Sequence, residues 1–135
     1  MITNFSFSEN MSFLKQEWNS IKDYKPANMP IIAFNYNKAK NAPNATPCLD
    51  TSRVGIYYQV PPNSEYINAS WLMLKSCQLT FRLIIAQGPT QETTGDFWRM
   101  CWQENVKSIV ILSNRIENKS SAFQRYWPKK EGELL

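Results

Sequence analysis

The first part of the chain carries apolar residues with the period of an α-helix. Four of them recur at helical intervals, namely Met11, Leu14, Trp18 and Ile21. Ser6 and Glu9 have the spacing of a capping box, in which two side chains satisfy backbone N–H groups at the first turn of a helix. The pattern predicts an amphipathic helix over about residues 8–22, which Pro26 ends.

The middle of the chain shows the period of β-strands. Residues 35–50 are rich in Asn, Pro, Ala and Lys and are expected to form a long loop. Residues 53–60 alternate, and one face of the predicted half-buried strand carries Val54, Ile56, Tyr58 and Val60. Two further β-prone runs cover about residues 66–74 and 79–86, with a polar turn between them. We expect these runs to form part of a twisted, mixed sheet.

A second helix and a further strand are predicted after residue 90. Asp96 is favourable near the positive end of a helix over about residues 94–104. One face of that helix carries Phe97, Met100 and Cys101. Residues 108–113 form a short, continuous apolar run, which is typical of a fully buried strand. The pattern as a whole predicts an α/β domain.

Composition limits the classes of protein that the chain can represent. Its 135 residues allow one domain at most, and 13% of them are aromatic, so they need a core or an interface. The net charge is +4, but the basic residues are scattered and no nucleic-acid motif is present. No apolar run has membrane-spanning length and no secretory signal is evident, so we expect an intracellular, cytoplasmic protein with reduced thiols.

The candidate chemistry is sparse. The three cysteines, Cys48, Cys77 and Cys101, match neither a zinc site nor a disulfide framework. The chain contains no histidine, which excludes a His-dependent metal site and a Cys–His nucleophile. We therefore expect no catalytic, cofactor-binding or metal-binding residues, and no cofactor. The cysteines are interpreted as small apolar packing residues.

Four segments, in this order and spacing, resemble the N-terminal half of the protein tyrosine phosphatase domain. They are residues 49–54 (LDTSRV), 66–70 (YINAS), 85–89 (IAQGP) with 94–100 (TGDFWRM), and 109–112 (IVIL) leading to Glu117 and 126–128 (YWP). The resemblance implies a truncated phosphatase-like α/β domain over residues 49–135, preceded by a helix and loop over residues 1–48.

Most of the resembling residues are interpreted as structural. Asn68 is expected to bind backbone groups near a strand end, and residues 87–89 to fix a strand exit. Phe97, Trp98 and Trp102 are expected to pack the second helix on the sheet. The resemblance implies that Arg53 orients loops of the core.

The resemblance also implies which catalytic elements to seek. Phosphatases of this family use a Cys-x5-Arg phosphate loop and an Asp on a Trp-Pro-Asp loop. Both elements belong to the C-terminal half of the family domain. None of the three cysteines has the required arginine, and the only Trp-Pro pair, Trp127-Pro128, is followed by Lys129. We therefore expect that the chain is not an enzyme.

Recognition of phosphotyrosine is doubtful on the same grounds. In active relatives a loop before the Asp50 region carries a Tyr that stacks on the phosphotyrosine ring and an Asp that holds the peptide backbone. Counting back from Asp50 places Pro43 and Ala45 at these two positions. A Lys-Cys pair of active relatives is replaced by Ala122-Phe123, whereas Glu117 stands as in active members.

Three functional hypotheses remain open. The chain is a pseudophosphatase that acts by binding a protein partner, or a truncated gene product without function, or one half of an enzyme completed by a second chain. Residues 47–50 and the short N-terminus resemble phosphatase-like proteins of polydnaviruses (bracoviruses) of parasitoid wasps. That resemblance implies interference with phosphotyrosine signalling inside a host cell.

Overall fold

The protein is described by a computed structural model that covers residues 7–25, 27–76, 79–112, 116–117, 120–121, 125–128, 130 and 132. Along the chain, its elements are α1 (Phe7–Ile21), α2 (Ile32–Tyr36), the 3-10 helix η1 (Lys38–Lys40), β1 (Arg53–Gly55), β2 (Tyr66–Ser76), β3 (Leu79–Ala86), α3 (Thr94–Gln103), β4 (Ile116–Glu117) and β5 (Ser120–Ser121).

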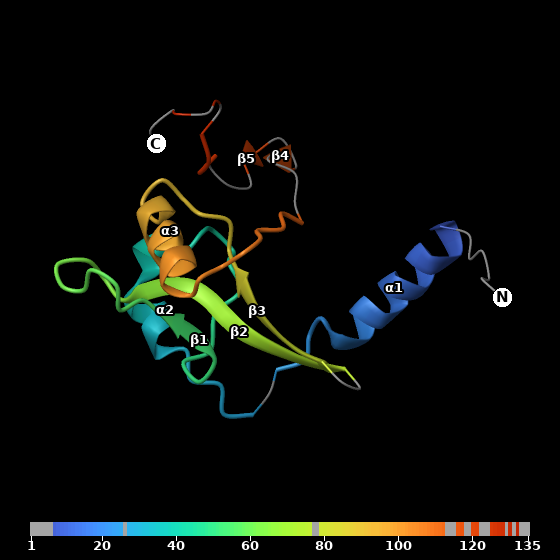
Figure 1. Ribbon diagram of the computed structural model, residues 1–135. Coiled ribbons are helices and arrows are strands. Elements are labelled where there is room, and N and C mark those ends of the chain that lie inside the picture. The colour runs from blue at the N-terminus through green and yellow to red at the C-terminus, as the bar shows by residue number, and fades with distance from the viewer. Residues whose placement is uncertain are drawn as a thin grey trace.

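The strands β1, β2 and β3 form one sheet in that order, and both pairings are antiparallel. The pairing of β2 with β3 runs from Ala69 opposite Ala86 to Ser76 opposite Leu79, and it produces the long, twisted hairpin seen in Figure 1. A separate short pair joins β4 to β5. The α/β class is confirmed. The parallel pairing that a mixed sheet requires is not found among the described strands.

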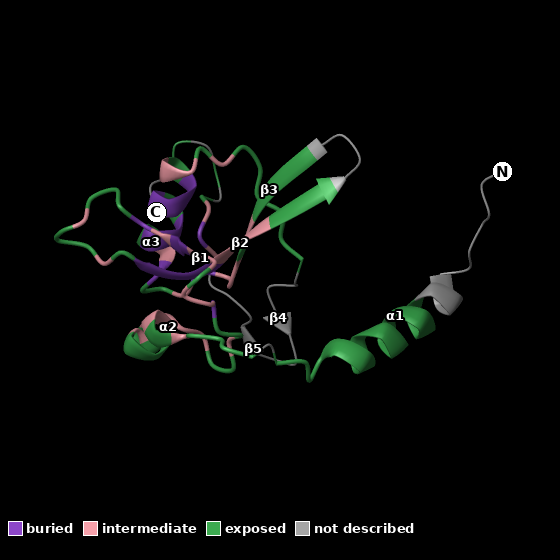
Figure 2. Ribbon diagram, turned by 90° about the horizontal axis from the view of Figure 1, so that it is seen from below, coloured by how far each residue is buried: buried purple, intermediate pink, exposed green. Residues whose placement is uncertain are grey.

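The core lies between the sheet and α3, as the buried residues of Figure 2 show. It consists of Val54, Ile56, Ile67, Ala69, Phe97, Met100, Cys101 and Tyr126. Alternate residues of β1 and β2 face this core because side chains of a strand point to opposite sides. The predicted helix over residues 94–104 and its apolar face are therefore confirmed within one residue at the C-terminal end.

The N-terminal helix is confirmed, but its apolar face has no cover among the described residues. α1 lies apart from the sheet and α3 in Figure 1. The side chains expected to be buried, Met11, Leu14, Trp18 and Ile21, are 41–62% exposed. The capping residue Ser6 lies outside the described part of the chain.

Two predictions for the middle of the chain are wrong in part. The strand over residues 53–60 ends at Gly55, since the chain then enters turns in which Gln59 has a positive φ of 57°. Val54 and Ile56 are fully buried as predicted, whereas Tyr58 is exposed. The predicted loop over residues 35–50 contains the end of α2 and the whole of η1.

The predicted buried strand at residues 108–113 is not formed over its described part. Residues 108–112 have no regular secondary structure, and Val110 and Leu112 are 78% and 96% exposed. A continuous apolar run forms a buried strand only where neighbouring strands supply backbone partners and covering side chains. The described part of the chain supplies neither.

Candidate functional site

The loop over residues 41–49 is the segment in which the sequence predicted a recognition surface, and a glutamine holds it on the sheet. Gln87 lies just after β3. Its side-chain oxygen accepts a hydrogen bond of 3.1 Å from the backbone N–H of Ala42, and its side-chain N–H donates to the carbonyl of Lys40 at 2.8 Å. One amide therefore fixes both ends of the turn that leads into the loop.

Asn68 supplies a second anchor from β2. Its side-chain N–H groups donate to the carbonyl of Thr46 at 3.1 Å and to the side-chain oxygen of Gln87 at 3.2 Å. Asn68 is buried, so these partners satisfy an amide that water does not reach. The expectation that Asn68 binds backbone groups near a strand end is confirmed.

A buried phenol completes the inner side of the loop. The hydroxyl of Tyr66 donates to the side-chain oxygen of Asn41 at 2.7 Å and lies 3.8 Å from Cys48 Sγ. Burial and the neighbouring Cys48 raise the pKa of Tyr66 above its usual range, although the Asn41 contact lowers it. Tyr66 is therefore a neutral structural group at physiological pH.

Three charged side chains link the loop to α3. Asp96 accepts hydrogen bonds of 2.6 Å from Lys40 Nζ and 2.6 Å from Arg99, and both Asp96 and Arg99 are buried. Arg99 also donates to the carbonyls of Tyr58 and Ser64 at 2.8 and 2.9 Å. This group, the Lys40–Asp96–Arg99 triad, ties the recognition loop to the helix and to the turns before β2. Its cations already have partners inside the protein.

The outer side of the loop offers little chemistry. Residues 42–45 form a turn closed by the Ala45 N–H and the Ala42 carbonyl at 3.0 Å, and Asn44 has a φ of 60°. Pro43 is exposed at this turn and Ala45 is half-buried. Neither side chain supplies an aromatic ring or a carboxylate, so the turn can contact a ligand only through small apolar groups and its backbone.

The preceding helix is fixed by the aspartate of the LDTSRV segment. Asp50 accepts hydrogen bonds from the backbone N–H groups of Ile32 and Ala33 at 2.6 and 2.9 Å. These groups lie in the first turn of α2, where N–H groups lack partners within the helix. The sequence analysis did not identify this role, and only the side-chain type suggested it.

The described cysteines pack in the core. Cys48 and Cys101 are free and buried, and burial raises the pKa of the Cys101 thiol. A buried thiol of raised pKa is a poor nucleophile. The interpretation of these two as packing residues is confirmed, and Cys77 lies outside the described residues. No three potential metal ligands come together within the described ranges.

The aromatic residues of α3 divide between the core and the surface. Phe97 packs against Tyr126, with ring centroids 4.8 Å apart. Trp98 is partly exposed, and its indole N–H donates to the carbonyl of Tyr126 at 2.8 Å. The expectation that Trp102 packs on the sheet is wrong, because its side chain is 76% exposed. At residues 97, 100 and 101 the helical period selects the core face, and Trp102 lies outside it.

Arg53 does not contact a core loop through a side-chain pair. Its guanidinium binds Glu65 at 2.9 Å, in the segment between β1 and β2. Glu117 lies in β4, and nothing is described of its side chain, while Ala122 and Phe123 lie outside the described residues. The expectations for these positions stay predictions.

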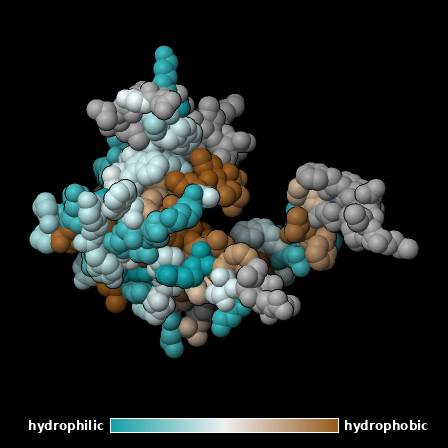
Figure 3. Space-filling view, viewed as in Figure 1, coloured by the Kyte–Doolittle hydropathy of each residue, from teal (hydrophilic) through white to brown (hydrophobic). Residues whose placement is uncertain are grey.

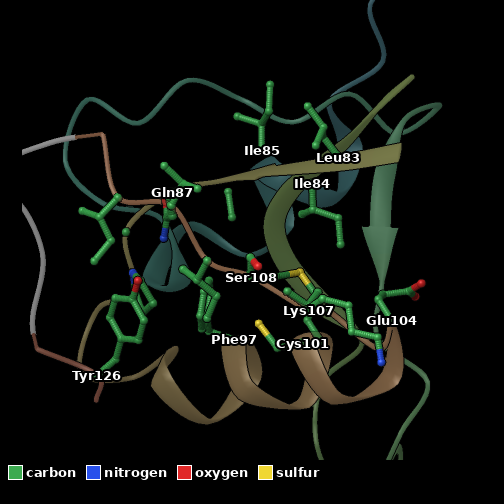
Figure 4. Close-up of a pocket in the computed structure, with 18 of the residues that line it drawn as sticks. Leu83, Ile84, Ile85, Gln87, Phe97, Cys101, Glu104, Lys107, Ser108 and Tyr126 are labelled. Carbon is green, nitrogen blue, oxygen red and sulfur yellow. The ribbon is translucent and has the colours of Figure 1, made fainter. Parts of the chain in front are cut away.

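On the other side of the core, an apolar groove runs along the edge of β3. Its volume is about 790 Å³, and its walls come from β3, α3 and residues 105–112. Figure 4 shows Ile84 pointing toward α3 and Cys101, with Leu83 and Ile85 on the opposite side of the strand. Hydrophobic side chains gather on the side of the body that faces α1 in Figure 3. The sequence analysis expected apolar exposure here but no groove.

None of the helices in the described residues has both the length and the apolar character needed to cross a membrane.

Residues 37–135 match the protein-tyrosine phosphatase family. Three similar proteins illustrate the range. Receptor-type tyrosine-protein phosphatase eta of Gallus gallus is 38% identical over 70% of this chain. Receptor-type tyrosine-protein phosphatase alpha of Mus musculus is 42% identical over 63% of it. Phosphatidylinositol phosphatase PTPRQ of Rattus norvegicus is 35% identical over 94% of it. The chain spans only 5–10% of the length of these relatives.

A solved structure has the same fold. It comes from work on the structural basis of the PTPN18 fingerprint on distinct HER2 tyrosine phosphorylation sites. Its similarity covers 95% of this chain and 44% of that chain, with a TM-score of 0.69 and 25% sequence identity. The matched part is therefore less than half of the solved relative.

Proposed function

The chain belongs to the protein-tyrosine phosphatase family, and from this we propose that its 135 residues act by binding a protein partner rather than by hydrolysing phosphotyrosine. One observation carries the proposal. The loop over residues 41–49 keeps its anchors to Asn68, Gln87 and the Lys40–Asp96–Arg99 triad, yet Pro43 and Ala45 occupy the positions that would contact a phosphotyrosine peptide.

The absence of a nucleophile in the sequence supports the same proposal. The 135 residues contain no Cys-x5-Arg motif and no Trp-Pro-Asp motif. Phosphoryl transfer in this family needs a thiolate, a cradle of N–H groups with an arginine, and a proton donor for the leaving group. Cys48 and Cys101 are buried in the core, and Arg99 is held by Asp96 and two carbonyls. These groups are not placed for that chemistry.

The buried features favour a folded binding unit over a gene product without function. The triad and the Asn68–Gln87 pair are polar groups with partners, as expected of a specified core. The exposed apolar residues 109–112 favour the alternative, because a monomer rarely exposes a continuous run of this kind. A partner that covers this run reconciles the two observations.

The cellular role follows from the resemblance of residues 47–50 to polydnavirus phosphatase-like proteins. On that basis the bound partner belongs to the phosphotyrosine signalling of a host cell. The Mus musculus and Gallus gallus relatives do not bear on this resemblance, which stays a prediction.

An activity and binding assay tests the proposal. The purified chain is incubated with p-nitrophenyl phosphate and with a phosphotyrosine peptide, beside an active phosphatase domain as positive control. We expect no release of phosphate above buffer, and equal, weak fluorescence-polarisation signals for the phosphorylated and unphosphorylated peptides. Release that disappears in Cys48→Ser or Cys101→Ser would show a catalytic cysteine and contradict the proposal.

A further inference from the structure

The strand β3 has a partner on one edge only. Its pairing with β2 uses one row of backbone groups, and no described strand pairs with the other row. Phe81, Leu83 and Ile85 on one face of β3 are exposed, whereas Ile84 and Ala86 on the other face pack against the core. Unpaired N–H and C=O groups along such an edge are a template for another strand.

A second apolar segment lines the same groove. Residues 108–112 border it opposite β3, and four of them are Ile109, Val110, Ile111 and Leu112. All four are exposed, and no sheet pairing joins them to another described segment. The groove therefore has two walls of strand-forming sequence, each without a strand partner within the part of the chain that the structure describes.

We propose that this groove accepts an apolar β-strand from a partner, inserted between the free edge of β3 and residues 108–112. Backbone groups of the inserted strand pair with the edge of β3, and its side chains replace water along the groove. The inference rests on the proposed binding function and names its partner. Pairing on both sides would convert residues 108–112 into the strand that their sequence favours.

The occupant is the remainder of a protein-tyrosine phosphatase domain. The PTPN18 structure shares the fold of 95% of this chain while using only 44% of its own length, so more than half of that chain has no counterpart here. The uncovered apolar surfaces lie on one side, where the groove faces α1 (Figure 3). One body seated there would cover the groove and meet α1. A second copy is less suited, since each carries a net charge of +4.

Co-expression tests the proposal. This chain is produced together with the part of the phosphatase domain of receptor-type tyrosine-protein phosphatase alpha that follows the matched region. We expect a one-to-one complex by size-exclusion chromatography with light scattering. The double variant Val110→Glu/Leu112→Glu should weaken the complex at least tenfold, because it places two carboxylates in the groove. Both residues are exposed, so the chain alone should unfold as the parent does.

Trp102→Glu is the matched control, since Trp102 is a large, exposed apolar residue outside the groove lining. It should change the affinity less than twofold. A complex that withstands the double variant, or equal losses in both variants, would overturn the proposal. So would a dimer of this chain alone that the double variant dissolves.

A second measurement covers a remainder that does not dissolve by itself. The remainder is joined after Leu135 as one polypeptide, and amide hydrogen exchange is followed in β3 and in residues 109–112. Exchange at least tenfold slower than in the separate chain supports insertion of a strand, and unchanged exchange rejects it. Phosphate release by this chain alone would contradict the proposed function without affecting the docking result, so the two failures are distinguishable.

Discussion

Lys40 Nζ lies 2.6 Å from Asp96 Oδ2, although 56 residues separate the two along the chain. The contact joins the start of the recognition loop to the first turn of α3, and Arg99 shares the same carboxylate. A buried carboxylate with two cationic partners is sensitive to the loss of its charge, because the cations then remain in a poorly solvated site.

Replacing this carboxylate should destabilise the fold. We expect Asp96→Asn to lower the free energy of unfolding by about 3–5 kcal/mol, the range for breaking a buried ion pair. Urea unfolding followed by tryptophan fluorescence measures it. Glu65→Gln removes the exposed partner of Arg53 and should cost about 0–1 kcal/mol. Equal costs for both variants would contradict the role given to the triad.

The side-chain amide of Gln87 should control the mobility of the loop. Gln87→Ala removes the acceptor of the Ala42 N–H and the donor to the Lys40 carbonyl, and it leaves Asn68 with one partner fewer. We expect a loss of about 1–3 kcal/mol for unsatisfied buried groups, with faster hydrogen exchange at Ala42. Gln103→Ala, which removes similar contacts to Tyr57 and Tyr58, should leave exchange at Ala42 unchanged.

Truncating the aromatic residues of α3 should separate core from surface. Phe97→Ala is expected to cost about 3–5 kcal/mol, since Phe97 is buried against Tyr126. Trp102→Ala should lie within about 0.5 kcal/mol of the parent, as for other exposed positions. Both values come from urea midpoints at constant slope. A large loss in the Trp102 variant would mean that this face of α3 is covered in solution.

Stability should fall at alkaline pH. Burial raises the pKa of Cys101, and burial together with the nearby Cys101 charge raises the pKa of Tyr126. A raised pKa in the folded state gives stability that is complete below the unfolded value and is lost as pH rises through the folded value. The urea midpoint should therefore be constant from pH 6 to 8 and decline above about pH 9. In Cys101→Ala the decline should be shallower, and an increase with pH would refute the assignment.

The chain by itself should unfold cooperatively. The residues Val54, Ile56, Ile67 and Phe97 belong to one buried cluster, which supports a single transition. Tryptophan fluorescence against urea should give a sharp sigmoid. A gradual, featureless curve would mean that the core forms only in a complex, and it would favour a gene product without function.

The sequence predicted elements wherever a local period sufficed. The helix at residues 7–21, the run at residues 79–86 and the core face of α3 follow from spacings within one element. Residues 108–112 failed because an apolar run says nothing about the presence of a strand beside it. The strand at residues 53–60 failed because turns after Gly55 were hidden by alternating Tyr and Val side chains.

The candidate site was predictable in part. Resemblance identified Pro43 and Ala45, and Asn68 followed from its place at a strand end. The partners Lys40 and Asp96 could not be paired from one sequence, since 56 residues separate them and no local period links them. Nor could the groove be predicted, because its two walls meet only through the packing of β3 and α3.

The exposed run at residues 109–112 bears on how long the molecule survives in a cell. Quality-control proteases and chaperones act on accessible apolar segments, and binding removes such segments from their reach by mass action. Copies without a partner should therefore be cleared, while bound copies persist. The steady-state amount of this chain would then follow the supply of its partner rather than its own rate of synthesis.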